Sequence, residues 1–160
     1  MTKEKLPVTS AIRFLREHQV DFIERPYKYE EHGGTGTAAK AFGVDEYLVI
    51  KTLVMEDDEK KPFIILMHGD REVSTKALAR TIGVKSVNPC SPEVALKHTG
   101  YMVGGISPFG TKKPLPIYAE ESILSLPKIF INAGRRGLLC EISPSDLIKV
   151  LNPKSVRVAR

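Results

Sequence analysis

A lysine inside an apolar strand is the first residue in this sequence whose setting suggests chemistry. Lys51 lies in the run VIKTLVM, where the period of two in a strand points it the same way as Val49 and Leu53. An ammonium group among apolar neighbours needs a partner. Either its stem reaches a rim or a salt bridge, or the group faces a polar cleft that takes an anion or a carbonyl.

A glycine-rich loop offers backbone donors for the same chemistry. Residues 99–116, TGYMVGGISPFGTKKPLP, contain the pair Gly104 and Gly105, whose N–H groups can approach a carbonyl or phosphate oxygen because no side chain covers them. Lys112 and Lys113 follow closely and would attract phosphates. An ordinary bulge and turn with two solvated lysines is the structural alternative.

A second loop places two arginines between predicted strands. It is NAGRRG, residues 132–137, and the planar guanidinium groups of Arg135 and Arg136 suit phosphate or carboxylate recognition, although arginines at a hairpin tip also serve solubility. Tyr27 follows a proline on a predicted edge strand. It is either a half-buried aromatic residue or a ligand contact.

Other catalytic motifs are absent or out of context. Gly34, Gly36 and Ala39 match the dinucleotide pattern GxGxxA, but the preceding strand is polar, contains a proline and ends in two glutamates that would repel a pyrophosphate. The sequence has no GxxxxGK[ST] phosphate loop and no GxSxG serine motif. Its four histidines share no ligand spacing, so no metal site is predicted.

Composition indicates one domain in a reducing compartment. The 160 residues are 42% hydrophobic and 27% charged, which is typical of a single globular domain, predicted here to span residues 1–160. Two cysteines without a CxxC pattern favour a cytoplasmic protein. The start MTKEKLPVTS does not resemble a signal peptide, and no run approaches the ~20 apolar residues of a membrane helix, so no membrane partner is expected.

Charge favours a polyanionic partner such as nucleic acid. The net charge is +5, and residues 81–160 hold 11 Lys and Arg against 5 Asp and Glu. A modest basic excess also serves solubility, so the pattern by itself leaves both interpretations open.

Short helices and strands that alternate along the sequence must position these residues. Helices are predicted at residues 10–18 with Thr9 or Ser10 as the cap, 38–42 with Thr37 as the cap, 74–82, 91–100 and 146–151. Strands are predicted at residues 21–29, 47–56, 63–68, 101–105, 116–120, 128–132, 138–143 and 156–159. The strand 47–56 is apolar on both faces and should lie at the centre of the sheet. The predicted fold is a single α+β domain with a mixed, largely antiparallel, barrel-like sheet surrounded by helices.

Three motifs together resemble one known family. VIKTLV, TGYMVGGISPFGTKK and NAGRRGLLCEI are similar, in order and spacing, to the YbaK/EbsC family of aminoacyl-tRNA deacylases across nearly the whole chain. The resemblance implies the fold of the YbaK and prolyl-tRNA synthetase-associated domain. It also implies a free-standing enzyme that removes cysteine from mischarged Cys-tRNA(Pro), or also from Cys-tRNA(Cys), beside prolyl-tRNA synthetase. No metal or organic cofactor is implied.

The resemblance further implies a mechanism and a set of site residues. The thiol of the cysteinyl group attacks the carbonyl of its own ester, and the cysteinyl group leaves the tRNA as a thiolactone. No protein nucleophile is therefore needed. The expected catalytic groups are Lys51, Tyr27, Gly104 and Gly105, with the lysine orienting the substrate and the glycine N–H groups holding the carbonyl oxygen. The expected substrate and tRNA contacts are Thr52, Ser107, Lys112, Lys113, Asn132, Arg135 and Arg136.

Two departures from the family pattern keep alternatives open. Asn132 and Ala133 stand where a Ser-Gly pair is expected, and residues 30–37 are unlike the family stretch. Both differences bear on pocket size, so a deacylase that prefers alanine or another small amino acid is an alternative. A different class, a non-catalytic tRNA- or nucleotide-binding module, would use the basic half of the chain without turnover.

Overall fold

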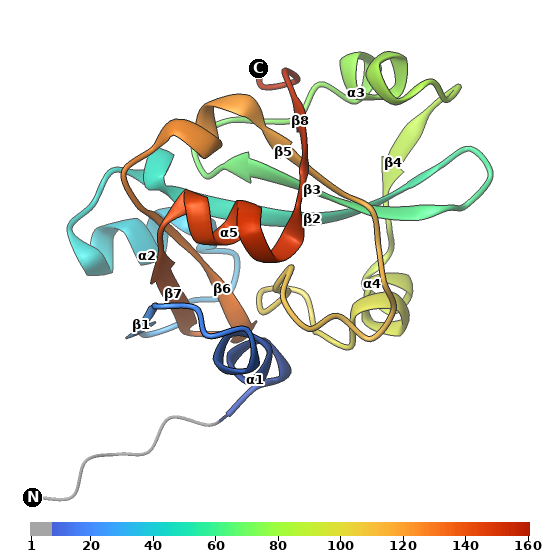
Figure 1. Cartoon of the computed structure of the whole chain (residues 1–160). Helices are drawn as coiled ribbons and strands as arrows, with labels where there is room; N and C mark the ends of the chain where they lie inside the picture. Colours follow the sequence, from blue (N-terminus) through green and yellow to red (C-terminus); the bar gives the residue numbers. More distant parts are fainter. Residues whose placement is uncertain (1–7) are drawn as a thin grey trace, which may run out of the picture.

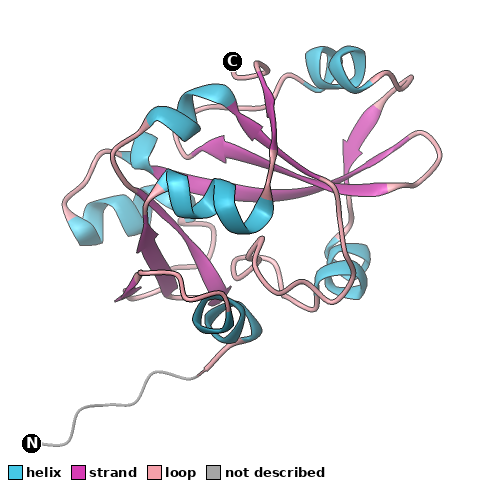
Figure 2. Ribbon diagram, in the orientation of Figure 1, coloured by secondary structure: helices cyan, strands magenta, loops and turns pink. Residues whose placement is uncertain are grey.

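A mixed β-sheet with helices packed around it forms the part of the chain that the structure, a computed structural model, describes (Figures 1 and 2). That part is residues 8–160, so the polar segment 1–7, and with it the start of the predicted domain 1–160, lies outside the described residues. The helices are α1 (Ser10–Glu17), α2 (Gly34–Phe42), α3 (Thr75–Ile82), α4 (Pro92–Thr99) and α5 (Pro144–Leu151), with short 3-10 helices η1 (Glu46–Leu48) and η2 (Glu121–Ser125). The strands are β1 (Ile23–Pro26), β2 (Val49–Asp57), β3 (Pro62–His68), β4 (Val87–Pro89), β5 (Ile117–Glu120), β6 (Ile129–Arg135), β7 (Leu138–Ile142) and β8 (Lys154–Val156).

The sheet has the order β1-β7-β6-β2-β3-β5-β8, and β4 pairs with β2 off this path. β2 runs antiparallel to β3 and β4 and parallel to β6, while β5 is parallel to both β3 and β8. The predicted mixed sheet and the central place of β2 are therefore confirmed. Within residues 8–160 no ladder joins β1 to β8, so the barrel-like sheet is open between them.

Most helix ends lie where capping residues predict them. The Thr9 and Ser74 hydroxyls accept backbone N–H groups at the starts of α1 and α3, and Gly83 and Gly100 end α3 and α4 in the left-handed conformation. The start of α2 was predicted wrongly, because the helix begins at Gly34 without a side-chain cap rather than after Thr37. Glycine lowers local helix propensity, and tertiary packing overrides it here.

The predicted strand 101–105 is wrong, because this segment is a turn. Gly104 has a φ of +90°, and the Gly105 N–H donates to the Met102 carbonyl at 2.8 Å. A residue in the left-handed region cannot continue an extended strand. The last strand also differs from the prediction: β8 spans Lys154–Val156 instead of residues 156–159. Within residues 157–159, Ala159 forms an isolated bridge with Val73.

The main core packs α1 and α5 against one face of the sheet, where Leu15, Leu147 and Ile131 are fully buried. A second apolar cluster lies under α3 around Met67 and Leu78, and a third lies beside α2 around Phe130. In the described part of the chain no helix has the length and apolar character needed to cross a membrane.

Lys51 lies between the second and third clusters. Val49 belongs to the third cluster and Met55 to the second, and the period of two along β2 puts both on the same face as Lys51. The predicted orientation of the lysine among apolar neighbours is thus confirmed. The lysine marks a break in that apolar surface.

Candidate functional site

The sheet has a gap beside the middle of β2. On this edge β6 pairs only with Val49 and Ile50, and β4 pairs only with residues 55–57. Figure 1 shows β4 and β6 near opposite ends of β2. Residues 51–54 consequently pair with no strand residue on this edge within residues 8–160, and the Cys90 N–H donates to the Val54 carbonyl there at 3.0 Å.

A cavity of about 610 Å³ occupies this gap, a volume usual for a small-molecule site. Every residue of β2 from Val49 to Met55 contributes to its wall, so the cavity passes from one face of the strand to the other. The remaining lining residues are Tyr27, Tyr29, Glu31, His32, Gly34, Thr35, Ala38, Pro89, Cys90, Ala95, Val103, Gly104, Ile106, Asn132, Arg136 and Leu139.

Lys51 lines the cavity, and a backbone carbonyl holds its ammonium. Lys51 is partly buried, and its Nζ donates to the carbonyl of Arg71, in the turn that follows β3. The Arg71 N–H donates to the His68 carbonyl at 3.1 Å, and its guanidinium lies 5.5 Å from the centre of the Tyr47 ring. Because an ammonium has three donors, this bond leaves others for a ligand.

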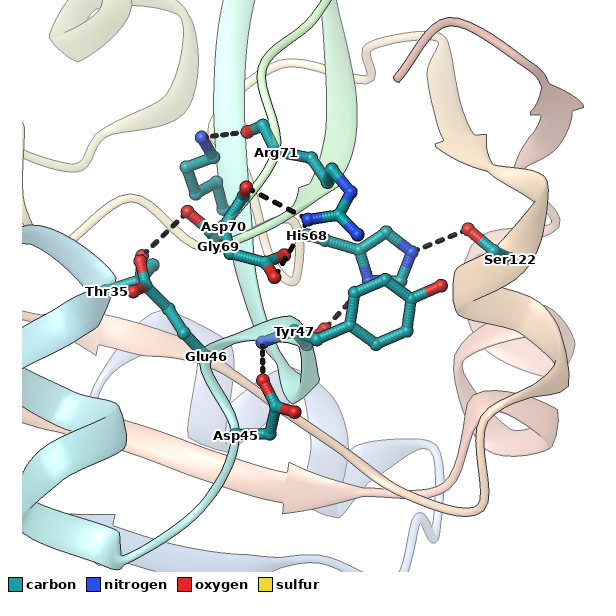
Figure 3. A network of polar contacts seen from close by, with 10 residues as sticks. Thr35, Asp45, Glu46, Tyr47, His68, Gly69, Asp70, Arg71 and Ser122 are labelled. Atoms are coloured by element: carbon teal, nitrogen blue, oxygen red, sulfur yellow. Dashed lines mark hydrogen bonds and ion pairs between the residues drawn. The ribbon is translucent and has the colours of Figure 1, made fainter. Parts of the chain in front are cut away.

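A buried polar network fixes the turn that holds Lys51 (Figure 3). The ring of His68, which is 1% exposed, bonds through Nδ1 to the Tyr47 carbonyl at 2.7 Å and through Nε2 to the Ser122 hydroxyl at 2.6 Å. The same ring stacks on Tyr47 at 3.7 Å between centres. Satisfied buried networks of this kind rigidify their surroundings.

The helix α2 braces the turn from a second side. Thr35, which lines the cavity, donates its hydroxyl to the Glu46 carboxylate at 2.7 Å and lies 3.3 Å from the Gly69 carbonyl. A Cβ at Gly69 would stand 2.6 Å from Thr35 Oγ1 and 2.7 Å from the Val49 carbonyl oxygen, so only glycine fits there. Neither His68 nor Thr35 was predicted as part of the site, because only the tertiary contacts reveal them.

Gly104 lines the same cavity as Lys51. Its carbonyl accepts from Asn132 Nδ2 at 3.1 Å, and its N–H has no acceptor within residues 8–160. A free N–H at a cavity wall can bind a carbonyl oxygen. Gly105 was predicted as a second such donor, and this is wrong: it is buried, and its N–H already donates to the Met102 carbonyl.

Two tyrosines and an arginine line the cavity beside Gly104. Tyr27 packs edge-on against Phe42, and burial, together with the nearby Tyr29, raises the pKa of its phenol. It is therefore a neutral hydrogen-bonding group at physiological pH. Arg136 donates from Nε to the Val103 carbonyl at 2.9 Å and lies over the ring of Tyr29, a residue that the sequence did not single out.

The structure brings together only part of the predicted set. The predicted residues that line the cavity are Tyr27, Lys51, Thr52, Gly104, Asn132 and Arg136. Ser107 does not, because it is 0% exposed and its hydroxyl accepts the Phe109 N–H at 3.1 Å, so its expected substrate contact is not supported. Lys112, Lys113 and Arg135 are exposed outside the lining, and their tRNA contacts stay predictions.

Two lining residues, Cys90 and Thr52, carry a thiol and a hydroxyl. Burial, with the Glu56 charge, raises the pKa of the Cys90 thiol to about 11, so at neutral pH it is not a thiolate nucleophile. The Thr52 hydroxyl is buried and has no hydrogen-bond partner within residues 8–160. Buried polar groups are rarely left unpaired, but this hydroxyl has no surface open to the cavity, so its expected substrate contact is not supported.

Comparison with known proteins assigns this chain to a class. Residues 32–150 match the model of the aminoacyl-tRNA editing domain. An Enterococcus faecalis protein named "Putative Cys-tRNA(Pro)/Cys-tRNA(Cys) deacylase EbsC" is 30% identical over 145 residues, which cover 90% of this chain and 88% of that protein. The chain belongs to the YbaK/EbsC family of aminoacyl-tRNA editing domains, as the sequence motifs predicted, and its function is aminoacyl-tRNA editing.

Two further relatives extend the comparison. A proline–tRNA ligase of Shouchella clausii is 32% identical over 124 residues, but this match covers 77% of the chain and only 22% of the ligase. A crystal structure described as "a putative trans-editing enzyme for prolyl tRNA synthetase" superposes with a TM-score of 0.81, over 94% of this chain and 97% of that one, at 23% identity. That similarity shows the shared fold.

Proposed function

We propose that this protein is a trans-acting deacylase that removes cysteine from mischarged Cys-tRNA(Pro). The observation that carries the proposal is the cavity that Lys51 and Gly104 both line, since the Gly104 N–H has no acceptor within residues 8–160. The name of the Enterococcus faecalis relative, which mentions Cys-tRNA(Pro) and Cys-tRNA(Cys), supports the choice of cysteine.

The reaction uses the nucleophile that the substrate carries. The cysteinyl thiol attacks its own ester carbonyl carbon, so that an S–C bond forms while the C–O bond to the ribose breaks. The thiol proton leaves to solvent, and the ribose oxygen of the tRNA takes one up. The product is a thiolactone that water opens to cysteine. Intramolecular attack avoids the entropic cost of bringing in a second reactant.

The protein supplies orientation and a place for negative charge. The Gly104 N–H holds the ester carbonyl oxygen, and the Lys51 ammonium, fixed by the Arg71 carbonyl, stabilises the charge that develops on that oxygen. Cys90 does not compete as a nucleophile, because its raised pKa keeps it a neutral thiol.

The rest of the tRNA is recognised outside the cavity. Lys112, Lys113 and Arg135 are exposed, and phosphates of the acceptor stem are their proposed ligands. Phosphate contacts position a nucleic acid but carry little sequence information. Selection of tRNA(Pro) is therefore assigned to prolyl-tRNA synthetase as the partner, and the proposed location is the cytoplasm.

Ester loss from a panel of aminoacyl-tRNAs tests this function. Cys-tRNA(Pro) should be cleaved, whereas Ala-tRNA(Pro) and a tRNA(Pro) that carries S-methylcysteine should survive, because neither offers a free thiol. Equal cleavage of all three would refute the substrate-assisted mechanism. Salt-sensitive tRNA binding without any ester loss would instead identify a non-catalytic module.

The lysine is tested with a matched pair of variants. Lys51→Met should lower kcat on the order of a hundredfold, as does the loss of other groups that stabilise a developing oxyanion. Lys76→Met removes an exposed lysine from α3, away from the cavity, and should leave the rate unchanged. An active Lys51→Met protein would remove the lysine from the mechanism.

A further inference from the structure

Arg136 holds a flat cation at the cavity wall. Its guanidinium carbon lies 5.2 Å from the centre of the Tyr29 ring, and its Nε donates to the Val103 carbonyl at 2.9 Å. These two contacts fix the plane of the group. Arg136 is nevertheless exposed, so the guanidinium keeps surface that a ligand can cover.

The surroundings of this pair differ from those of an ordinary surface ion pair. Within residues 8–160 no carboxylate forms a salt bridge with Arg136, and both Arg136 and Tyr29 line the cavity. Val103, which is 46% exposed, adds apolar surface to the same wall. A planar cation, an aromatic ring and an apolar side chain are the groups on which nucleobases stack.

The pair also lies directly against the proposed reaction centre. A Cβ at Gly104 would stand 2.8 Å from Tyr29 Oη and 3.1 Å from Arg136 Nε. The ester that the proposed function places at Gly104 is attached to the ribose of the last nucleotide. The base of that nucleotide must therefore lie no farther from Tyr29 and Arg136 than the length of one nucleotide.

We propose that Tyr29 and Arg136 form a nucleobase platform that takes the terminal base of the tRNA acceptor end. The identity of the ligand rests on the proposed function. The platform assigns Arg136 a role in base stacking, distinct from the phosphate contact that its charge alone suggests. It also gives Tyr29 a role in binding the substrate.

Two small probes separate base binding from phosphate binding. Adenosine carries the base without a phosphate, and ribose 5-phosphate carries the phosphate without a base. Titration of each into the purified protein, followed by NMR chemical shifts, should show binding of adenosine and much weaker binding of ribose 5-phosphate. Comparable or tighter binding of ribose 5-phosphate would overturn the platform in favour of a phosphate site.

Variants test the two members of the platform. Arg136→Ala and Tyr29→Leu should each weaken adenosine binding about tenfold or more, the effect usual for loss of a stacking partner. Arg136→Lys should weaken it as well, because lysine keeps the charge and loses the plane. Tyr29→Phe keeps the ring and should bind normally. Arg80→Ala is the matched control, since it removes an exposed arginine from α3 that lies outside the lining.

The outcomes also separate this inference from the proposed function. If the wild-type protein cleaves Cys-tRNA(Pro) while Arg136→Lys retains full adenosine binding, or Arg80→Ala loses as much as Arg136→Ala, the platform is refuted alone. If the wild-type protein binds adenosine with the expected variant pattern but cleaves no aminoacyl-tRNA, only the deacylase proposal fails. Thermal melting of each variant shows that it is folded, and Tyr29→Leu carries the test if Arg136→Ala is not.

Discussion

Replacing Gly104 with alanine separates two reasons for a glycine at this position. The first is backbone conformation, because Gly104 has a φ of +90°. The second is space, because the new Cβ would stand 2.8 Å from Tyr29 Oη, which is 0.6 Å inside the 3.4 Å at which ordinary van der Waals contact begins. Because Tyr29 Oη is the far end of a side chain, Tyr29 can move aside without unfolding the protein. That movement would nevertheless change the geometry of the site.

The expected magnitudes follow from these two terms. An L-residue in the left-handed region costs roughly 1 to 2 kcal/mol, which lowers the melting temperature of a domain of this size by about 2 to 8 °C. Displacing a group beside the reacting ester by a sizeable fraction of an ångström lowers kcat on the order of tenfold to a hundredfold. The activity should thus fall much further than the stability explains.

Gly83→Ala is the matched control. Gly83 has a φ of +79° at the end of α3, and a Cβ there would meet nothing within 4 Å. It carries the same backbone strain without crowding and away from the cavity. Its melting temperature should fall as in Gly104→Ala, and its rate of Cys-tRNA(Pro) deacylation should stay at the wild-type level.

Melting curves and single-turnover deacylation rates, measured on both variants, decide the matter. If Gly104→Ala deacylates as fast as Gly83→Ala, the space at Gly104 has no role in the reaction, and our geometric argument is refuted. If Gly104→Ala melts far below Gly83→Ala, the crowding disturbs the fold itself, and the rate no longer reports on the site.

Two further predictions concern the cavity wall. Thr52→Val removes a buried hydroxyl that has no partner within residues 8–160, so the free energy of unfolding should stay equal or rise by about 1 kcal/mol. Denaturant unfolding measures this change, and a large loss of stability would show that the hydroxyl is paired. Burial raises the pKa of Cys90 from 9.0 to about 11, so iodoacetamide should modify this thiol more slowly than free cysteine at pH 8. The rate of modification should rise as the pH approaches 11. Peptide mass mapping measures the modification, and rapid labelling of Cys90 at pH 7 would contradict the prediction.

The sequence predicted the elements that local chemistry determines. Helix α4 has its Ser-Pro start and its glycine end because both signals act within one turn. The segment 101–105 was mistaken for a strand because the conformation of Gly104 depends on packing against Tyr29 and Arg136, which lie far away in the sequence. The sequence did not predict β4, because a strand of three residues is too short to show alternation of polar and apolar residues.

The site was predictable where a residue type conflicts with its surroundings. Lys51 in an apolar strand is such a conflict, and the structure places it in a break between two apolar clusters. His68 ends an apolar strand without any motif, and its network depends on partners from η1 and η2. Ser107 is the opposite case: the family resemblance implied a substrate contact for it, whereas the fold buries it.

The short ladder between β2 and β6 has a consequence for the range of substrates. Only Val49–Phe130 and Ile50–Ile131 pair across it, so few main-chain bonds tie β6, β7 and β1 to the rest of the sheet. Cohesion along this seam comes from the apolar side chains around Phe130 and Leu139. Val49 and Leu139 belong to this cluster and also line the cavity, so we expect substitutions that change the size of buried residues such as Phe130 to alter the cavity volume.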